Sequence, residues 1–299
     1  MSDNHLIHIV KYSPEQTPIA HVHLLHGMAE HIDRYDEFAQ FLVEHGFIVS
    51  GHDHRGHGKT AEKNGQLGFW AEKDGFERVT EDVREVLVQV REDMEKIPLI
   101  LFGHSMGSFI ARRYMQKYSE SLAKIVICGT AFSPGVMGDI GTIIGKVASK
   151  MQSPQTESNL LNTLSFGGFN KRVKDAQTDF DWLSSDADEV KKYIEDPLCG
   201  FIPSNQFYID LFSGLKTIHK EEEINKIRKN LPVLIVSGSQ DPVGKDGKDV
   251  FKVAKSFTDA GMNNVTVQLI ENARHEILNE VNKMQTYQYI VNWMIKNDG

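Results

Sequence analysis

Six short apolar runs, separated by longer amphipathic stretches, constrain the fold more than any other feature of this sequence. They are HVHLL (21–25), FIVSG (47–51), IPLILF (97–102), KIVIC (124–128), PVLIV (232–236) and VTVQLI (265–270). Several are apolar at consecutive positions, which is typical of strands covered on both faces. The alternation of strands with helical patterns predicts an α/β fold, a mostly parallel sheet flanked by helices.

The intervening stretches 33–45, 75–95 and 276–296 carry apolar residues at helical spacing, and the last is expected to bury Ile277, Val281, Met284, Ile290, Val291 and Met294. Residues 131–230 contain no clear core strand, and a structureless loop of that length inside a domain is implausible. We therefore expect a core built from 1–130 and 231–299, with 131–230 forming a largely helical cap over one end of the sheet.

Composition narrows the classes of function. The 299 residues carry a net charge of −8, which argues against a nucleic-acid partner. The start MSDNHLIHIVKY has no secretory pattern, and no apolar run is long enough to span a membrane. The sequence thus favours a cytoplasmic protein; peripheral membrane contact stays open, and the oligomeric state is undetermined.

A serine between two glycines marks the candidate site. The pentapeptide GHSMG (103–107) fits G-x-S-x-G, with a strand before it and a helix (108–117) after it. That context places Ser105 on a sharp, strained turn, where larger flanking side chains would collide with the neighbouring elements. We interpret Ser105 as a nucleophile; the plainer alternative is a turn that only connects the two elements.

A serine hydroxyl needs a base, and that base needs an orienting acid. Asp241 follows the strand at 232–236 and His275 follows the strand at 265–270, in the chain order Ser, Asp, His. Both lie where an open α/β sheet builds its site. Asp246 and Asp249, expected to be solvated, and Glu271 are weaker candidates for the acid.

The negative oxygen formed during attack on an ester needs two donors. The backbone N–H of Met106, directly after the serine, is the expected first donor. The strand at 21–25 is followed by His26-Gly27, which makes the Met28 N–H the expected second donor.

Thirteen histidines invite a metal interpretation. Clusters such as HVHLLH (21–26) and GHDHRGHGKT (51–60) match no familiar zinc spacing, so we expect neither a metal nor a cofactor. DHRGHGKT also approximates a phosphate-binding loop, but aspartate stands at position 53 where the motif has glycine.

Four blocks carry a resemblance to a known family: residues 26–60, GHSMGS (103–108), SGSQDPVG (237–244) and ARHEILNE (273–280). The chain resembles the α/β-hydrolase superfamily, within it the monoacylglycerol lipase and lysophospholipase branch, also labelled serine aminopeptidase-like. The resemblance implies an eight-stranded sheet, a cap after the sixth strand, and the Ser105, Asp241 and His275 triad with Met28 and Met106 as donors. Ser108 departs from the glycine common in relatives. Glu30 and Arg34 match the E-H-x-x-R pattern, and we expect them to pair.

The predicted activity is hydrolysis of carboxylic esters of the monoacylglycerol or lysophospholipid type. In the cap, Ile140, Ile144 and Val147 share a helical face that either covers an acyl-chain groove or packs on the core. An aminopeptidase would show the same triad, with an acid of the cap such as Asp179 or Asp181 gripping the substrate amine. A catalytically silent binding protein and a nucleotide hydrolase are the remaining alternatives; a serine nucleophile argues against an epoxide hydrolase or a dehalogenase.

Overall fold

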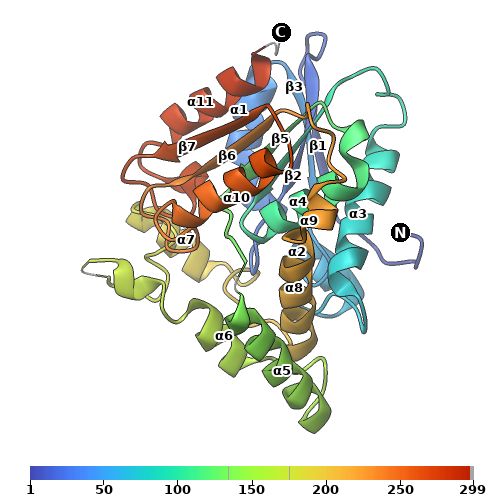
Figure 1. The fold of residues 1–299 in the computed structure, drawn as a ribbon. Coiled ribbons are helices and arrows are strands. Elements are labelled where there is room, and N and C mark those ends of the chain that lie inside the picture. Colours follow the sequence, from blue (N-terminus) through green and yellow to red (C-terminus); the bar gives the residue numbers. More distant parts are fainter. Residues whose placement is uncertain (134, 175, 297–299) are drawn as a thin grey trace.

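The structure is a computed structural model and describes residues 1–133, 135–174 and 176–296. Its sheet has the strand order β1-β3-β2-β4-β5-β6-β7 (Figure 1). The strands are β1 (Ile9–Tyr12), β2 (Ala20–Leu25), β3 (Phe47–His52), β4 (Leu99–His104), β5 (Lys124–Cys128), β6 (Val233–Gly238) and β7 (Val265–Ile270). Only β1 is antiparallel to its neighbour, and all six expected strands are confirmed.

The described residues form seven strands, where the resemblance implied eight, so the segment 131–230 follows the fifth strand rather than the sixth. The difference lies at the N-terminal edge, where β1 is the only strand before β2. Pro14 and Pro18 occupy the connection between them. Because proline lacks the N–H that a ladder needs, this connection is a poor place for another strand.

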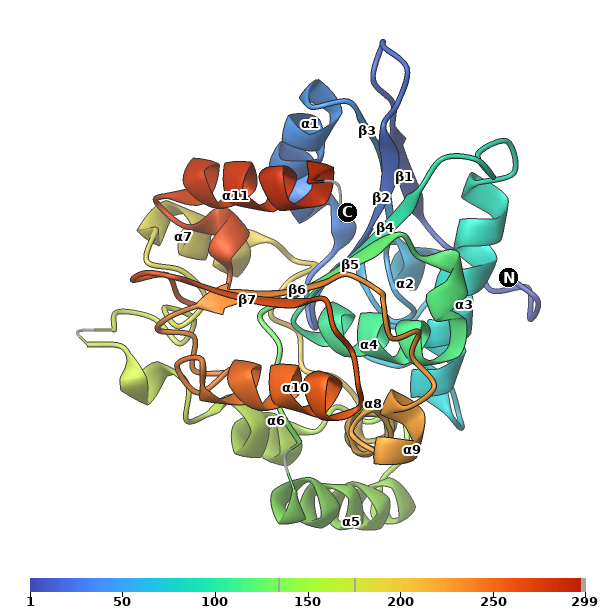
Figure 2. The ribbon, with the colours of Figure 1, turned by 45° about the horizontal axis from the view of Figure 1, so that its top comes forward.

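Helices cover both faces of the sheet, as Figure 2 shows from nearly edge-on. α1 (Asp36–Glu44) and α11 (Lys283–Ile295) lie on one face, while α3 (Gly75–Val90), α4 (Met106–Tyr118) and α10 (Lys248–Asp259) lie on the other. Each face has its own buried cluster, one centred on side chains such as Phe38 and Tyr287, the other on side chains such as Ile110 and Phe257. Burying each such side chain contributes about 1.5–3 kcal/mol.

The last helix begins later than the sequence suggested. Residues 277–279 form a short 3-10 turn and α11 starts at Lys283. The Glu280 carboxylate accepts hydrogen bonds from the backbone N–H groups of Arg274 and Ser185, which holds a bend before the helix. As a result Val281 and Met284, expected in the buried stripe, are exposed.

The segment 131–230 carries α5 (Val136–Met151), α6 (Asn159–Phe166), α7 (Ala187–Glu195), α8 (Asn205–Ile218) and α9 (Glu221–Ile224). α5 and α6 lie beyond the carboxyl ends of the strands, at the bottom of Figure 1. α8 packs against the core of the domain, because its Phe207 and Leu211 belong to the same buried cluster as side chains of α3 and α4. We call residues 131–230 the cap segment. Across the described ranges, no helix has both the length and the hydropathy to cross a bilayer.

Candidate active site

Ser105 occupies a strained turn between β4 and α4. Its φ of 53° and ψ of −119° lie outside the regions that non-glycine residues normally adopt, a conformation that costs about 1–3 kcal/mol. The flanking glycines are required by close approach: a Cβ on Gly103 would lie 2.3 Å from the Gly107 carbonyl oxygen, and one on Gly107 would lie 2.2 Å from the Leu25 oxygen. The turn therefore has the geometry expected of an exposed nucleophile.

Asp241 and His275 form a buried pair. The imidazole Nδ1 lies 3.0 Å from Asp241 Oδ1, and both side chains are almost fully buried. Asp241 also accepts hydrogen bonds from Ser237 Oγ and the Val243 N–H. Burial alone would raise the pKa of Asp241, but His275 and these donors lower it below its ordinary value. The carboxylate is thus ionised and held against Nδ1.

Gly238 allows the two loops that carry this pair to meet. A Cβ on Gly238 would lie 2.0 Å from the Arg274 carbonyl oxygen and 2.2 Å from that of Ala273. Gln240 N–H donates to the Ala273 oxygen at 2.9 Å, which fixes the approach. Because β6 and β7 are neighbouring parallel strands, their following loops share one edge of the sheet.

Ser105 and His275 line the same cavity of about 410 Å³, which we call the polar cavity because its walls are more polar than those of the second cavity described below. The loop after β2 forms its other side, where a Cβ on Gly27 would lie 3.2 Å from the Ser105 Cβ. Met28 lines this cavity, and Met106 begins α4, so its N–H is at the positive end of a helix. Among the described residues, neither the Met28 nor the Met106 N–H donates a hydrogen bond to a protein atom.

A buried ionic network joins the three loops around the cavity. Arg34 donates to both carboxylate oxygens of Glu276 at 2.7 Å and also pairs with Glu30. Glu30 in turn accepts hydrogen bonds from the Gly27 N–H and the Tyr35 hydroxyl. The expected Glu30–Arg34 pair is therefore confirmed. Arg34 and His104 lower the pKa of Glu30 despite its burial.

His104 connects this network to the serine turn. Its Nδ1 lies 3.0 Å from the Tyr35 hydroxyl and its Nε2 lies 3.3 Å from the His275 carbonyl oxygen. Burial opposes protonation, but the Glu30 carboxylate raises the pKa of His104 above its ordinary value. His104, which precedes Ser105, and Glu276, which follows His275, thus belong to one hydrogen-bonded network.

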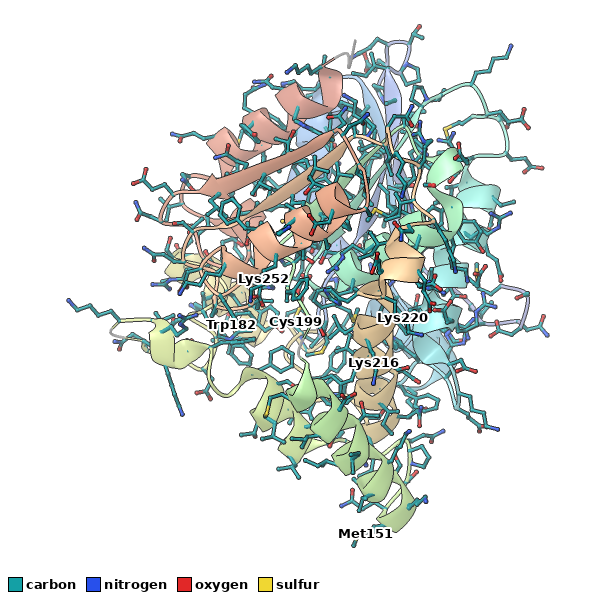
Figure 3. The ribbon with its side chains drawn as sticks, in the orientation of Figure 1. Met151, Trp182, Cys199, Lys216, Lys220 and Lys252 are labelled. Atoms are coloured by element: carbon teal, nitrogen blue, oxygen red, sulfur yellow. The ribbon has the colours of Figure 1, made fainter. Side chains whose placement is uncertain are left out.

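Part of the cap segment is fastened to the His275 loop. Arg274 donates to the carbonyl oxygens of Asp181 and Ser184, and the Glu276 N–H donates to that of Leu183 at 2.7 Å. The Trp182 ring lies 5.2 Å from the His275 ring, centre to centre. Figure 3 shows Trp182 between the strand ends and the cap helices. Residues 180–186 (FDWLSSD) therefore form one side of the polar cavity.

A second, apolar cavity of about 320 Å³ shares Met28, Ser105 and Phe166 with the polar one. Its walls come mainly from α4, α5, α6 and α8 and include Phe109, Ile140, Ile144, Leu164 and Phe212. Val147 is not among these lining residues and is 51% exposed, because α5 runs past the cavity toward Met151 (Figure 3). Ser105 therefore lies where a polar and an apolar cavity meet.

The histidine clusters lie outside this meeting point. His21 Nε2 and His23 Nδ1 each lie 2.7 Å from Ser50 Oγ, and His23 Nε2 lies 3.0 Å from His52 Nδ1. Burial lowers the pKa of all three imidazoles, so they are neutral members of the sheet.

Asp53 explains why DHRGHGKT (53–60) is not a phosphate-binding loop. Asp53 accepts hydrogen bonds from the N–H groups of Ile32 and Lys59, so its carboxylate lies at the start of α2 (Gly58–Asn64). A side chain on Gly58 would collide with that carboxylate. Because a negative charge already occupies this position, nucleotide binding is disfavoured.

Sequence reasoning missed several residues of the site and misjudged one. It did not identify Glu276, although it directly follows His275, because the partner that gives it meaning lies 242 positions away. Tyr35 and His104 lie within the motif blocks 26–60 and 103–108, but the sequence analysis assigned a role to neither of them. Asp249, expected to be solvated, is buried on α10 and paired with Lys252 of the same helix and with Lys245, which precedes the helix.

A mostly parallel sheet with a strained serine at the end of β4 and an aspartate–histidine pair after the last two strands defines an α/β-hydrolase. More narrowly, a family model described as serine aminopeptidase, S33 matches residues 16–282, and the chain belongs to this family.

Individual relatives are named as lipases and esterases. The monoacylglycerol lipase of Mycolicibacterium smegmatis is 26% identical over 293 residues, covering 96% of this chain and 91% of the relative. A thermostable carboxyl esterase from Bacillus coagulans superposes with a TM-score of 0.90 at 28% identity, covering 96% of this chain and 93% of that one. A structure described as the open form of a lipase gives 0.86 at 28% identity, with the same coverage. The chain is a carboxylic ester hydrolase.

Proposed function

We propose that this hydrolase cleaves monoacylglycerol-type esters through an acyl-enzyme on Ser105. The observation that carries the proposal is the position of Ser105 at the junction of an apolar and a polar cavity. An ester whose acyl chain occupies the apolar cavity and whose alcohol occupies the polar one has its carbonyl at the serine. Monoacylglycerol has this division into one chain and one polar alcohol.

In the proposed mechanism, His275 Nε2 accepts the Ser105 proton while Oγ attacks the ester carbonyl. Asp241 accepts a hydrogen bond from Nδ1–H, which holds the imidazole in the required tautomer and stabilises the imidazolium. The Met28 and Met106 N–H groups bind the negative oxygen. Losing one such donor typically costs about 2.7–4 kcal/mol of transition-state stabilisation. Water activated by the same histidine then cleaves the acyl-enzyme.

The size of the apolar cavity supports a medium-length acyl chain. A cavity of about 150 Å³ is known to accept benzene, so by simple scaling one of about 320 Å³ holds on the order of a dozen carbons. Activity on a series of monoacylglycerols should rise from acetyl toward this length. An activity that does not change beyond acetyl would contradict the acyl assignment.

Substitution of Ser105 tests the nucleophile directly. Ser105→Ala should abolish ester turnover and labelling by a fluorophosphonate probe while leaving the circular dichroism spectrum unchanged. Ser108→Gly is the matched control, because Ser108 lies one turn further along α4 and its hydroxyl bonds only the Ser105 carbonyl oxygen. Wild-type turnover by Ser105→Ala would overturn the proposal.

The peptidase alternative is not favoured. Asp181 and Asp186 are already bonded to backbone N–H groups of their own segment, and among the described acids of the cap segment only Asp179 lines the polar cavity. A matched pair of ester and amide substrates separates the two activities; faster cleavage of an amide with a free amine would reverse the order.

We also propose that the cap segment touches lipid surfaces. Exposed apolar side chains gather on α5 and α6, namely Met137, Ile143, Val147, Met151, Leu160 and Leu164. α5 and α6 are two of the four helices that wall the apolar cavity, so a chain leaving a lipid layer has a short path to Ser105. Ile143→Ser with Met151→Ser should weaken flotation with phosphatidylcholine vesicles. Val88→Ser, an equally exposed valine on α3, is the control and should not.

A further inference from the structure

Three metal-binding side chains from two distant segments converge beside the candidate active site. His31 lies in the loop after β2, whereas Asp196 and Cys199 lie between α7 and α8. A ring nitrogen of His31, a carboxylate oxygen of Asp196 and Cys199 Sγ all lie within 4.8 Å of one another. We propose that these side chains bind a zinc-class transition-metal ion, with water as the fourth ligand.

The backbone already holds the two segments together. The Gly200 N–H donates to the Ala29 carbonyl oxygen at 2.9 Å, which ties the turn after α7 to the loop before His31. Within the turn, the Cys199 N–H donates to the Asp196 oxygen at 3.0 Å and the Leu198 N–H donates to Asp196 Oδ1 at 2.8 Å. His31 Nε2 lies 2.7 Å from Asp196 Oδ2. The ligand atoms are therefore positioned before any ion arrives.

The donor set selects the type of ion. Imidazole nitrogen, carboxylate oxygen and thiolate sulfur together suit zinc, whereas calcium and magnesium require oxygen ligands. Metal–ligand bonds of about 2.0–2.3 Å place neighbouring tetrahedral ligands about 3.5 Å apart. Closing the cluster around an ion thus needs side-chain movements on the order of 1 Å. Asp196 is partly exposed, which leaves solvent access for the fourth ligand.

The surrounding charges are mixed: the Arg34 guanidinium is the strongest charge acting on the Cys199 thiol, and the carboxylates of Glu30, Asp196 and Glu276 act against it. Although burial works against ionisation, hydrogen bonds from His31 and the Leu198 N–H lower the pKa of Asp196, so this ligand is already anionic.

Ion binding displaces one proton. The S–H bond of Cys199 breaks as the sulfur–metal bond forms, and its proton goes to solvent. His31 binds the ion as a neutral imidazole through Nε2, the ring nitrogen that faces Asp196.

A bound ion would bridge the loop that carries Met28 and the cap segment without touching Ser105 or His275. Figure 3 shows Cys199 in the region between the strand ends and the cap helices.

Cobalt(II) provides the test, because a cobalt–thiolate bond gives a charge-transfer band that histidine or carboxylate ligation alone does not. Untagged protein titrated with cobalt chloride should develop this band to a one-to-one endpoint, and zinc chloride should abolish it. Cys199→Ser should remove the band. Cys128→Ala, at the chain's other thiol in β5, should retain it.

Absence of the band in the wild-type protein, or its survival in Cys199→Ser, would overturn the proposal. Asp196→Asn supplies an independent check if Cys199→Ser fails to fold: affinity should fall at least tenfold, and an unchanged affinity would also overturn the site. The absorbance does not depend on ester turnover, so failure here is distinguishable from failure of the proposed function.

Discussion

Acidification should destabilise the protein by several kcal/mol, because its sheet buries imidazoles that resist protonation. His21 on β2 and His52 on β3 are buried, and burial lowers their pKa to about 3. The pKa of His57, just before α2, is lowered to about 4 for the same reason. In the unfolded chain these groups titrate near the ordinary value of about 6.5.

The sign and size of the effect follow from linkage. Below pH 6.5 the unfolded state binds protons that the folded state excludes, so stability is lost as the pH falls. At pH 5 each such imidazole costs about 2 kcal/mol relative to neutral pH. Three of them cost about 6 kcal/mol, a large part of a typical total of about 5–15 kcal/mol. His104 has the opposite effect on stability: Glu30 raises its pKa, so the folded state binds this proton more tightly than the unfolded state does.

Urea unfolding at pH 7.5 and pH 5 measures this loss. His52→Asn removes one titrating group and keeps a polar atom beside His23 Nε2, with which His52 Nδ1 forms a 3.0 Å contact. The difference between the two pH values should shrink by about 2 kcal/mol in this variant, with an unchanged urea dependence. A wild-type difference below about 1 kcal/mol, or an undiminished difference in the variant, would refute the reasoning.

Three further changes test the site. Met28→Pro, which deletes a backbone N–H, should lower kcat by about 10²–10³, whereas Met28→Ala should not; equal losses in single-turnover assays would exclude the donor role. Ile144→Trp, which fills the apolar cavity, should shift the preferred monoacylglycerol to shorter chains, and an unchanged preference in the kcat/KM series would place the acyl chain elsewhere. Glu276→Gln should lower the free energy of unfolding by about 2–3 kcal/mol, since Arg34 loses a charged partner; stability within about 0.5 kcal/mol of wild type would show that the pair contributes little.

The elements that could be predicted from the sequence are those with a strong local signal. The runs that became β4, β5 and β6 are apolar at nearly every position because these strands are buried on both faces. β1 escaped prediction because its four residues are mostly half-buried, and such a short edge strand leaves little pattern. The bend before α11 was hidden for another reason: it depends on Glu280 bonding to Ser185 and Arg274, a contact between segments.

The same division applies to the site. Ser105, Asp241 and His275 could be predicted as candidates because each follows a recognisable strand, and parallel strands end at one edge. The ionic network was only half visible: the pairing of Glu30 with Arg34 follows from a spacing of four residues, but that of Arg34 with Glu276 joins opposite ends of the chain. His31, Asp196 and Cys199 likewise share no local pattern.

Glycines connect the local sequence motifs with the contacts between distant segments. Gly107 approaches the Leu25 oxygen and Gly238 approaches the Arg274 oxygen at distances where a side chain would collide, and a Cβ on Gly27 would lie 2.5 Å from Glu30 Oε1 and 3.2 Å from the Ser105 Cβ. These contacts bring the serine turn, the histidine loop and the loop after β2 together around one cavity. A glycine in a sequence motif thus indicates that another backbone segment passes close by. Only the folded structure identifies which segment that is. The strain at Ser105 persists because the close approach of Gly107 to the end of β2 holds the turn in place, and relaxing this contact should loosen the serine turn before it unfolds the core.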